Sequence, residues 1–294
     1  MTVDKSEKRK RWLVTGASGM LGRDVVARLE ADPERYEVVG LGRGALDITD
    51  WAACEAALVG FDVVVNCAAY TAVDEAEDHF DEAFDVNAVG AANLARAAAL
   101  CGARLVQLST DYVFGGHATQ PYPADHVMRP VSAYGRSKAA GEWAVMAAHA
   151  DHLVMRTAWL YGEHGTSFPR TIARVARERG RVDVVDDQVG QPTWTVDVAD
   201  LAVRLIEADA PGGAYAATSA GETSWFGFAQ QVVAAGGIDA EVRPSSSAAS
   251  DRPAPRPAYS AMSHDTLLQA GVRPIGPWSE RWAVAASCIV GTSA

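Results

Sequence analysis

A glycine-rich turn near the start of the chain restricts the choice of fold more than any other feature. Arg11–Thr15 is an apolar run typical of a buried strand, and Gly16, Gly19 and Gly22 follow at every third position. A helical pattern begins directly afterwards. Strand, glycine turn and helix in this order are the context of a dinucleotide-binding fingerprint, because glycines let the backbone approach a pyrophosphate and the helix N-terminus attracts its charge. We therefore expect the three glycines to bind a dinucleotide, although the spacing is G-x-x-G-x-x-G.

The rest of the first half alternates apolar runs with helical patterns. Helices are expected at 51–58 and 85–100, and strands at 37–42, 61–66, 104–109 and 153–162. Continuous apolar runs are typical of parallel strands that are buried on both faces of a sheet. The alternation predicts an α/β protein with a Rossmann-type doubly wound parallel sheet.

The second half breaks into shorter pieces. Helices are expected at 168–179, 196–208 and 225–235, strands at 182–185 and 213–217, and a loop from Pro244 to Pro257. We expect residues 1–165, with returning segments at about 196–219, to form a dinucleotide-binding domain. Residues 166–195 and 220–294 are expected to form a smaller C-terminal α/β lobe that binds the substrate.

Composition excludes several classes of partner. The formal net charge of −11 argues against nucleic acid, because phosphates repel an acidic surface. No apolar run approaches the length of about 18 residues that a membrane span needs. The 4 cysteines are scattered, and neither they nor the histidines show metal-ligand spacing. These features predict a cytoplasmic protein with reduced thiols, no membrane segment and no metal.

The residue after the second expected strand bears on the choice of cofactor. In a dinucleotide fold this strand end meets the adenosine ribose, where an acid binds the 2′-hydroxyl and an Arg accommodates a 2′-phosphate. The chain has Arg43 at this point. The sequence therefore predicts NADPH, with NADH as the alternative if Arg43 is only a surface residue.

The segment Ser132–Ala139 holds a tyrosine and a lysine four residues apart. If this segment opens a helix, Tyr134 and Lys138 project from one face. The ammonium would stabilise the phenolate, so we expect the pKa of Tyr134 to lie below its ordinary value of about 10. Thr110 ends a buried strand, at the sheet edge where α/β proteins bind ligands. We expect a substrate oxygen near this hydroxyl.

Several segments together resemble one known family. The glycine turn, Ser109–Phe114 and the Tyr134/Lys138 pair are similar to those of extended short-chain dehydrogenases/reductases. Four further segments narrow the resemblance to the dTDP-4-dehydrorhamnose reductase family: Asn66–Asp74, Arg156–Trp159, Asp187–Thr193 and Arg256–Ser260. The resemblance spans residues 11 to about 278.

This resemblance implies NADPH-dependent reduction of the 4-keto group of a dTDP-4-keto-6-deoxyhexose, foremost dTDP-4-dehydro-L-rhamnose to dTDP-L-rhamnose. It implies that Tyr134 gives the proton, that Lys138 binds the cofactor ribose, and that Thr110 hydrogen-bonds the reacting oxygen. Asp111 and Trp159 would line the sugar site. Further cofactor contacts are implied for Met20, Leu21, Asp47, Ile48, Ala68, Ala69 and Tyr70.

Departures from the family's pattern leave the identity and stereochemistry of the sugar undecided. The family often has Gly-Asn-Asn-Phe where this chain has Gly165–Phe168, and Tyr-His where it has Tyr215-Ala216. The alternatives are a 4-ketoreductase for another deoxysugar of an antibiotic pathway and a non-catalytic, cofactor-binding regulatory subunit. Some relatives bind magnesium between subunits through glutamates. Those ligands cannot be placed here, so no metal is expected, and a homodimer is left open.

Overall fold

The computed structural model describes residues 9–249 and 252–291. The first eight residues of the expected dinucleotide-binding domain lie outside this range. So do residues 250 and 251 of the expected Pro244–Pro257 loop and the last three residues of the expected substrate lobe.

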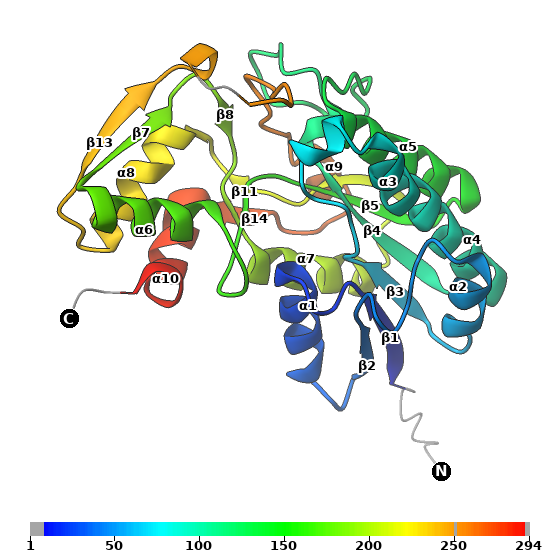
Figure 1. Cartoon of the computed structure of the whole chain (residues 1–294). Helices are drawn as coiled ribbons and strands as arrows, with labels where there is room; N and C mark the ends of the chain where they lie inside the picture. The colour runs from blue at the N-terminus through cyan, green and yellow to red at the C-terminus, as the bar shows by residue number, and fades with distance from the viewer. Residues whose placement is uncertain (1–8, 250–251, 292–294) are drawn as a thin grey trace.

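A six-stranded parallel sheet forms the centre of the molecule (Figure 1). Its strands, in spatial order, are β10 (Gly213–Ala216), β5 (Leu153–Thr157), β4 (Arg104–Thr110), β3 (Val63–Asn66), β1 (Lys10–Thr15) and β2 (Tyr36–Leu41). All five strand pairs are parallel. The strand order reverses between β1 and β3, and such switch points create a ligand crevice beyond the carboxyl ends of the strands. The predicted doubly wound parallel sheet is confirmed.

Helices cover both faces of this sheet. One layer contains α1 (Met20–Glu30) and α7 (Thr195–Glu207), and the other contains α2 (Trp51–Ala57), α4 (Ala91–Cys101) and α5 (Ala133–Ala148). Side chains alternate along a strand, so Trp12 and Val14 pack under the first layer while Leu13 packs under the second. Because both faces are buried, the central strands are mostly apolar, which explains the apolar runs in the sequence.

A smaller lobe, built from segments before and after β10 in sequence, lies beside the sheet (Figure 1). Its core is an apolar cluster among three helices and one parallel strand pair. These elements are α6 (Phe168–Arg179), α8 (Trp225–Ala235), α10 (Trp278–Val290), β7 (Arg181–Val185) and β13 (Glu241–Ser245). Short paired strands connect the lobe to the sheet: β6 (Leu160–Tyr161) with β9 (Thr193–Trp194), β8 (Val189–Gly190) with β12 (Thr223–Ser224), and β11 (Ser219–Ala220) with β14 (Ile275–Pro277).

The short helical elements complete the described chain. They are η1 (Glu75–Glu77), α3 (Phe80–Phe84), η2 (Asp85–Gly90), η3 (Asp111–Val113), η4 (Ser247–Ala249) and α9 (Asp265–Gln269).

Three predicted elements are wrong in part. The expected helix over 85–100 begins with the π-helical turn η2, where Asn87 packs closely against Gly141 of α5. The expected strand over 153–162 is interrupted after β5, because Trp159 has a left-handed φ of 47°. The expected loop from Pro244 starts inside β13, since β7 provides a parallel partner up to Ser245. The helices expected at 168–179 and 225–235 are confirmed.

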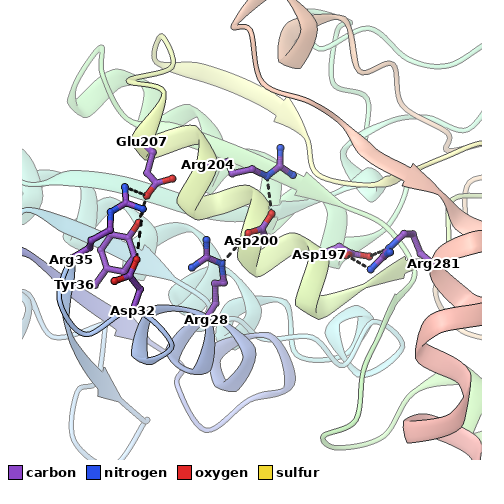
Figure 2. Close-up of polar contacts among 9 residues, drawn as sticks. All are labelled: Arg28, Asp32, Arg35, Tyr36, Asp197, Asp200, Arg204, Glu207 and Arg281. Carbon is purple, nitrogen blue, oxygen red and sulfur yellow. Dashed lines mark hydrogen bonds and ion pairs between the residues drawn. The ribbon is translucent and has the colours of Figure 1, made fainter.

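Helix α7 connects the sheet and the lobe through charged side chains (Figure 2). Arg28 of α1 and Arg204 of α7 both donate to Asp200, at 2.9 and 2.7 Å. Arg281 of α10 makes two hydrogen bonds to Asp197, each 2.8 Å long. One helix therefore holds the glycine-turn helix on one side and the lobe on the other.

Candidate active site

The glycine turn lies against the end of β3, and its geometry fits a dinucleotide phosphate. Gly16 has a φ of +64°, and a Cβ placed on it would lie 2.6 Å from the backbone nitrogen of Ala68. A Cβ on Gly22 would overlap the carbonyl oxygen of Gly16. Gly19 is the N-cap of α1 and has no side chain that could occupy the first N–H groups of the helix. These N–H groups are available to an anion, together with the positive end of the helix dipole.

The side chains next to the turn differ in what they can offer a cofactor. Leu21 is buried in the core, which leaves only its backbone for a ligand. Met20 lies close to the loop that enters the lobe, because a Cβ on Gly162 would be 3.1 Å from the Met20 Cγ. The turn is also tied to β2, since the Ala17 N–H donates to the Leu41 carbonyl at 3.1 Å.

The residues after β2 form the expected adenosine side of the site. Arg43 is exposed two residues beyond the strand. The N–H and hydroxyl of Thr49 donate to Asp47 at 3.0 and 2.8 Å, and these hydrogen bonds lower the pKa of its carboxyl. Ile48 is buried and packs against Gly90.

A chain of buried polar groups runs across the carboxyl ends of three strands and reaches Lys138. The Thr15 hydroxyl donates to Asn66 Oδ1 at 2.6 Å, and Asn66 Nδ2 donates to Gln107 Oε1 at 2.8 Å. Gln107 Nε2 and Lys138 Nζ then share the carbonyl oxygen of Leu108, at 2.8 and 2.6 Å. This series of hydrogen bonds holds the Lys138 ammonium at the carboxyl ends of the strands. Sequence reasoning missed Thr15 and Gln107, although a glutamine inside an apolar strand is itself a signal.

The loop after β3 is clamped between the sheet and α5. The Ala68 N–H donates to Asn66 Oδ1 at 3.0 Å. Asn87 accepts from the Tyr70 N–H at 2.9 Å and donates to both the Tyr70 carbonyl and the Ser137 hydroxyl at 3.0 Å. The backbone from Ala68 through Ala69 to Tyr70 is therefore held beside the glycine turn. Asn87 was not singled out from the sequence, because its partners lie on segments distant in the chain.

Tyr134 and Thr110 meet where β4 ends and α5 begins. Ser132 caps α5 by accepting from the Gly135 N–H at 3.1 Å, which places Tyr134 in the first turn of the helix. Its ring lies edge-on to Tyr112, with ring centroids 5.8 Å apart. Hydrogen bonding to the Thr110 hydroxyl favours the phenolate of Tyr134. The structure thus brings together the threonine and tyrosine that the sequence predicts.

The prediction that Lys138 lowers the pKa of Tyr134 is wrong for the protein without ligands. Desolvation by the surrounding protein raises the pKa of the Tyr134 phenol above its ordinary value, and the Thr110 hydroxyl offsets only part of this. The Lys138 ammonium donates to the Leu108 carbonyl instead. Burial lowers the pKa of Lys138 to about 8, against the opposing effect of Glu142. Burial, rather than the spacing of four residues, is the main cause of the pKa shifts of both groups.

Trp159 forms an aromatic wall between the sheet and the lobe. It stacks on Trp225 of α8, with ring centroids 3.5 Å apart and planes 6° apart. Phe168 of α6 contacts Trp225 at 4.4 Å between centroids. A Cβ on Gly190 would lie 2.6 Å from the Trp159 ring, so the glycine is required for this position of the indole.

A cleft of about 970 Å³ opens beside this wall. Its lining includes Tyr112, Phe168, Trp225, the serines at 245–247 and Arg256. Clefts of roughly 300–1,000 Å³ accept small-molecule ligands, and this one adjoins Tyr134 through Tyr112. The Arg256 guanidinium is held by Asp74 at 2.7 Å. The cleft therefore combines aromatic faces with hydroxyl and cationic groups.

Across the described part of the chain, the predicted site residues lie in four places. The glycines, Met20, Leu21 and the backbone of Ala68–Tyr70 lie at the switch point; Thr110, Asp111, Tyr134 and Lys138 lie at the end of β4; Trp159 lies on the lobe side. Arg43 stays apart from them at the exposed end of β2. The individual roles of these residues stay predictions.

Residues 9–249 and 252–291 lack two kinds of feature. There is no group of three or more His, Cys, Asp or Glu side chains placed to hold a metal ion. None of the described helices is long and apolar enough to cross a membrane.

Comparison with known proteins identifies the relatives of this chain. A family model described as RmlD substrate binding domain matches residues 10–288. A dTDP-4-dehydrorhamnose reductase of Streptomyces griseus is 47% identical over 278 residues, covering 92% of this chain and 91% of the relative. A probable dTDP-4,6-dihydroxy-2-methyloxan-3-one 4-ketoreductase of Streptomyces antibioticus is also 47% identical, over 279 residues, covering 91% of this chain and 92% of the relative.

Solved structures agree in fold. The crystal structure of a dTDP-4-dehydrorhamnose reductase from Bacillus anthracis, in complex with NADP, superposes with a TM-score of 0.91 at 36% identity. That match covers 95% of this chain and 99% of the other.

Proposed function

The chain belongs to the dTDP-4-dehydrorhamnose reductase family of extended short-chain dehydrogenases/reductases, and from this premise we propose that it reduces the 4-keto group of a dTDP-4-keto-6-deoxyhexose with NADPH. The foremost substrate is dTDP-4-dehydro-L-rhamnose, which gives dTDP-L-rhamnose. The observation that carries the proposal is the position of Thr110, Tyr134 and Lys138 at one sheet edge, next to the glycine turn.

The chain's own groups account for the proton side of the reaction. Bound NADPH would supply the hydride to the carbonyl carbon. The Tyr134 hydroxyl gives its proton to the carbonyl oxygen, and its raised pKa keeps that proton in place at neutral pH. The Thr110 hydroxyl hydrogen-bonds the same oxygen as negative charge develops on it. Lys138, anchored on the Leu108 carbonyl, is the cation that would bind the cofactor ribose.

The remaining contacts divide between cofactor and sugar. We propose that Gly16, Gly19 and Gly22 admit the pyrophosphate and that Arg43 accommodates the 2′-phosphate. Met20, Leu21, Asp47, Ile48 and Ala68–Tyr70 would complete the cofactor surface. Trp159 would line the sugar pocket, together with the cleft beside Tyr112.

A second candidate function is reduction of a different deoxysugar for a secondary metabolite. It is favoured by the 47% identity to the Streptomyces antibioticus ketoreductase, which equals that to the rhamnose enzyme. The position of Ala216 also supports it, because this residue replaces the histidine often found in the family and packs in the same apolar cluster as Trp159. A smaller, apolar side chain there would change the packing next to Trp159.

One experiment separates these functions. The purified protein is assayed for NADPH oxidation against a panel of dTDP-4-keto-6-deoxyhexoses, and the product epimer at C4 is assigned by NMR. Formation of dTDP-L-rhamnose supports the first function, and selective turnover of another 4-keto sugar supports the second. A protein that binds NADPH but turns over none of the panel would be the regulatory subunit instead.

We also propose the setting of this reaction. It would take place in the cytoplasm, with residues 1–165 and about 196–219 binding the cofactor and residues 166–195 and 220–294 binding the sugar. A homodimer is the assembly to test, by light scattering of the purified protein with and without NADPH.

A further inference from the structure

The Thr110 hydroxyl has one proton and three competing acceptors. Its oxygen lies 3.0 Å from Asp111 Oδ1, a distance at which it donates to an ionised carboxylate. The same proton is needed by the reacting oxygen in the reaction proposed above, and by the phenolate that Tyr134 leaves behind. A hydroxyl can donate only once, although it has two lone pairs that accept. The protonation state of Asp111 therefore decides where the Thr110 proton points.

The surroundings of Asp111 favour a neutral carboxyl. The side chain is 2% exposed. Its Oδ2 is buried and has no hydrogen-bond partner in the described residues, and no ion pair to Asp111 occurs in them. Burial raises the pKa of Asp111 to about 6, although the nearby hydroxyls of Ser260 and Thr110 and the backbone N–H groups of Asp111 and Tyr112 oppose this shift. Ionised carboxylates in proteins are normally paired or fully hydrogen-bonded, so an orphaned buried oxygen is a reason to expect the acid form.

The titratable and polar groups around Asp111 come from several segments. The phenols of Tyr112 and Tyr134 face it. Burial is the main cause that raises the pKa of each phenol, and Asp111 in its ionised form adds to the shift. The cations Arg252 and Arg256 and the carboxylate Asp74 act on the far side of Tyr112. Ser260 faces it from the C-terminal segment. None of these groups is a cation in contact with the Asp111 carboxyl.

We propose that Asp111 is a positioning residue that works in its protonated form, donating to the Thr110 hydroxyl and so freeing the Thr110 proton for the reacting oxygen. The geometry accommodates this arrangement. The Tyr112 N–H lies 3.2 Å from Thr110 Oγ1 and fills one lone pair. The Asp111 O–H would fill the other across the same 3.0 Å, because heavy-atom positions do not distinguish the two directions of this bond. The single Thr110 proton is then left to point into the site.

The proposal moves no proton through Asp111. The reacting oxygen takes its proton from Tyr134, the hydride comes from NADPH, and Thr110 contributes only a hydrogen bond. With a pKa of about 6, Asp111 of the free protein is mainly ionised at neutral pH, so its acid form at that pH depends on the anionic cofactor and sugar nucleotide. In that complex Asp111 is protonated before and after each turnover. This inference depends on the proposed reductase function, but its first test does not.

The first test is a titration of Asp111 itself. The full-length protein is labelled with ¹³C at aspartate carboxyls, and the spectrum of Asp111→Asn assigns the missing resonance. We expect this resonance to titrate near or above pH 6. Titration near the ordinary value of about 4 would overturn the proposal whether or not the protein is a reductase.

The second test is the pH dependence of the hydride step, measured as single-turnover NADPH oxidation with the accepted sugar. The rate should fall as the pH rises through the pKa of Asp111, because ionised Asp111 captures the Thr110 proton. Both ligands are anionic, which moves this fall to higher pH. We expect a loss of about 10²-fold or more, the scale of one oxyanion-hole donor. In Asp111→Asn this fall should disappear, since an amide does not titrate.

Matched variants separate this role from a structural one. Asp239→Asn, on an exposed carboxyl, should keep the wild-type pH profile. Thr110→Ser retains a hydroxyl and should keep the fall, whereas Thr110→Val should be slow at every pH and lack it. If Asp111→Asn is folded and merely slower, with the fall intact, Asp111 is structural and the proposal is wrong. A wild-type rate that is flat from pH 5 to 8 contradicts it equally.

Discussion

The two halves of this molecule obtain their cores in different ways. In the sheet, apolar strands such as Val63–Asn66 are buried on both faces by long helices. In the lobe, aromatic rings from distant segments, including Trp225, Phe228 and Trp282, pack among strands that pair over as few as two residues. The proposed chemical groups stand on the first region and much of the cleft lining on the second. The sheet thus carries the groups proposed to react, and aromatic rings of the lobe line the cleft proposed for the sugar.

The largest expected effect tests whether residues at the carboxyl ends of the strands carry out the reaction. Tyr134→Phe should lower kcat by about 10²-fold or more, because the proton donor is lost while the ring remains. The NADPH dissociation constant, measured by fluorescence titration, should stay nearly unchanged. Tyr215→Phe is the matched control, because the Tyr215 hydroxyl donates to the carbonyl of Pro211, a residue that precedes β10. Wild-type turnover by the Tyr134 variant would remove the acid role.

The next effect concerns the glycine turn. Gly16→Ala should weaken NADPH binding by about 10-fold or more, because the added Cβ would press on the Ala68 backbone and cost more than backbone strain alone. Gly102→Ala is a close control, as it has a φ of +74° and open space around its Cβ. Calorimetric binding and melting curves measure both variants. Equal NADPH affinity in the two would mean that the turn does not contact the cofactor.

A smaller effect is expected in the lobe, and it should change KM rather than kcat. Trp225→Leu removes the ring that supports Trp159, so KM for the nucleotide sugar should rise by about 10-fold, equal to about 1.4 kcal/mol. NADPH affinity should not change. Trp143→Leu provides the control, because that ring is 61% exposed on α5. A loss confined to kcat would contradict the division between the two halves.

The smallest effect tests cofactor choice. Arg43→Ala should raise KM for NADPH by roughly 5-fold to 10-fold and leave KM for NADH unchanged, since one charge-assisted hydrogen bond is lost. Arg174→Ala, at an exposed ion pair of α6, should alter neither value. Equal changes with both cofactors would show that Arg43 does not read the 2′-phosphate.

The same contrast explains what the sequence could predict. The strands and helices around the sheet, and the helix that carries Tyr134 and Lys138, follow from local patterns and were predicted. The pairing of β13 with β7 could not be, because residues 181 and 241 meet only after folding. The left-handed Trp159 and the Asn87 clamp likewise depend on partners distant in the chain.

The electrostatics of the site were the least predictable part. A Tyr and a Lys four residues apart suggested a lowered phenol pKa, but burial raises it and directs Lys138 to the Leu108 carbonyl. The Asp111 carboxyl shows the same dependence, since a carboxylate in the sequence gives no sign that one of its oxygens will be orphaned. Desolvation depends on the whole fold, and no local pattern encodes it.

The central claim is that Thr110, Tyr134 and Lys138 converge beside a bound nicotinamide ring. A crystal structure of the protein with NADP and the dTDP-sugar product tests it most directly. We predict that the Tyr134 and Thr110 hydroxyls both lie about 2.6–3.2 Å from the C4 oxygen of the sugar, with Lys138 on the cofactor ribose. A nicotinamide ring bound away from Tyr134, or a sugar whose C4 oxygen faces neither hydroxyl, would contradict the account.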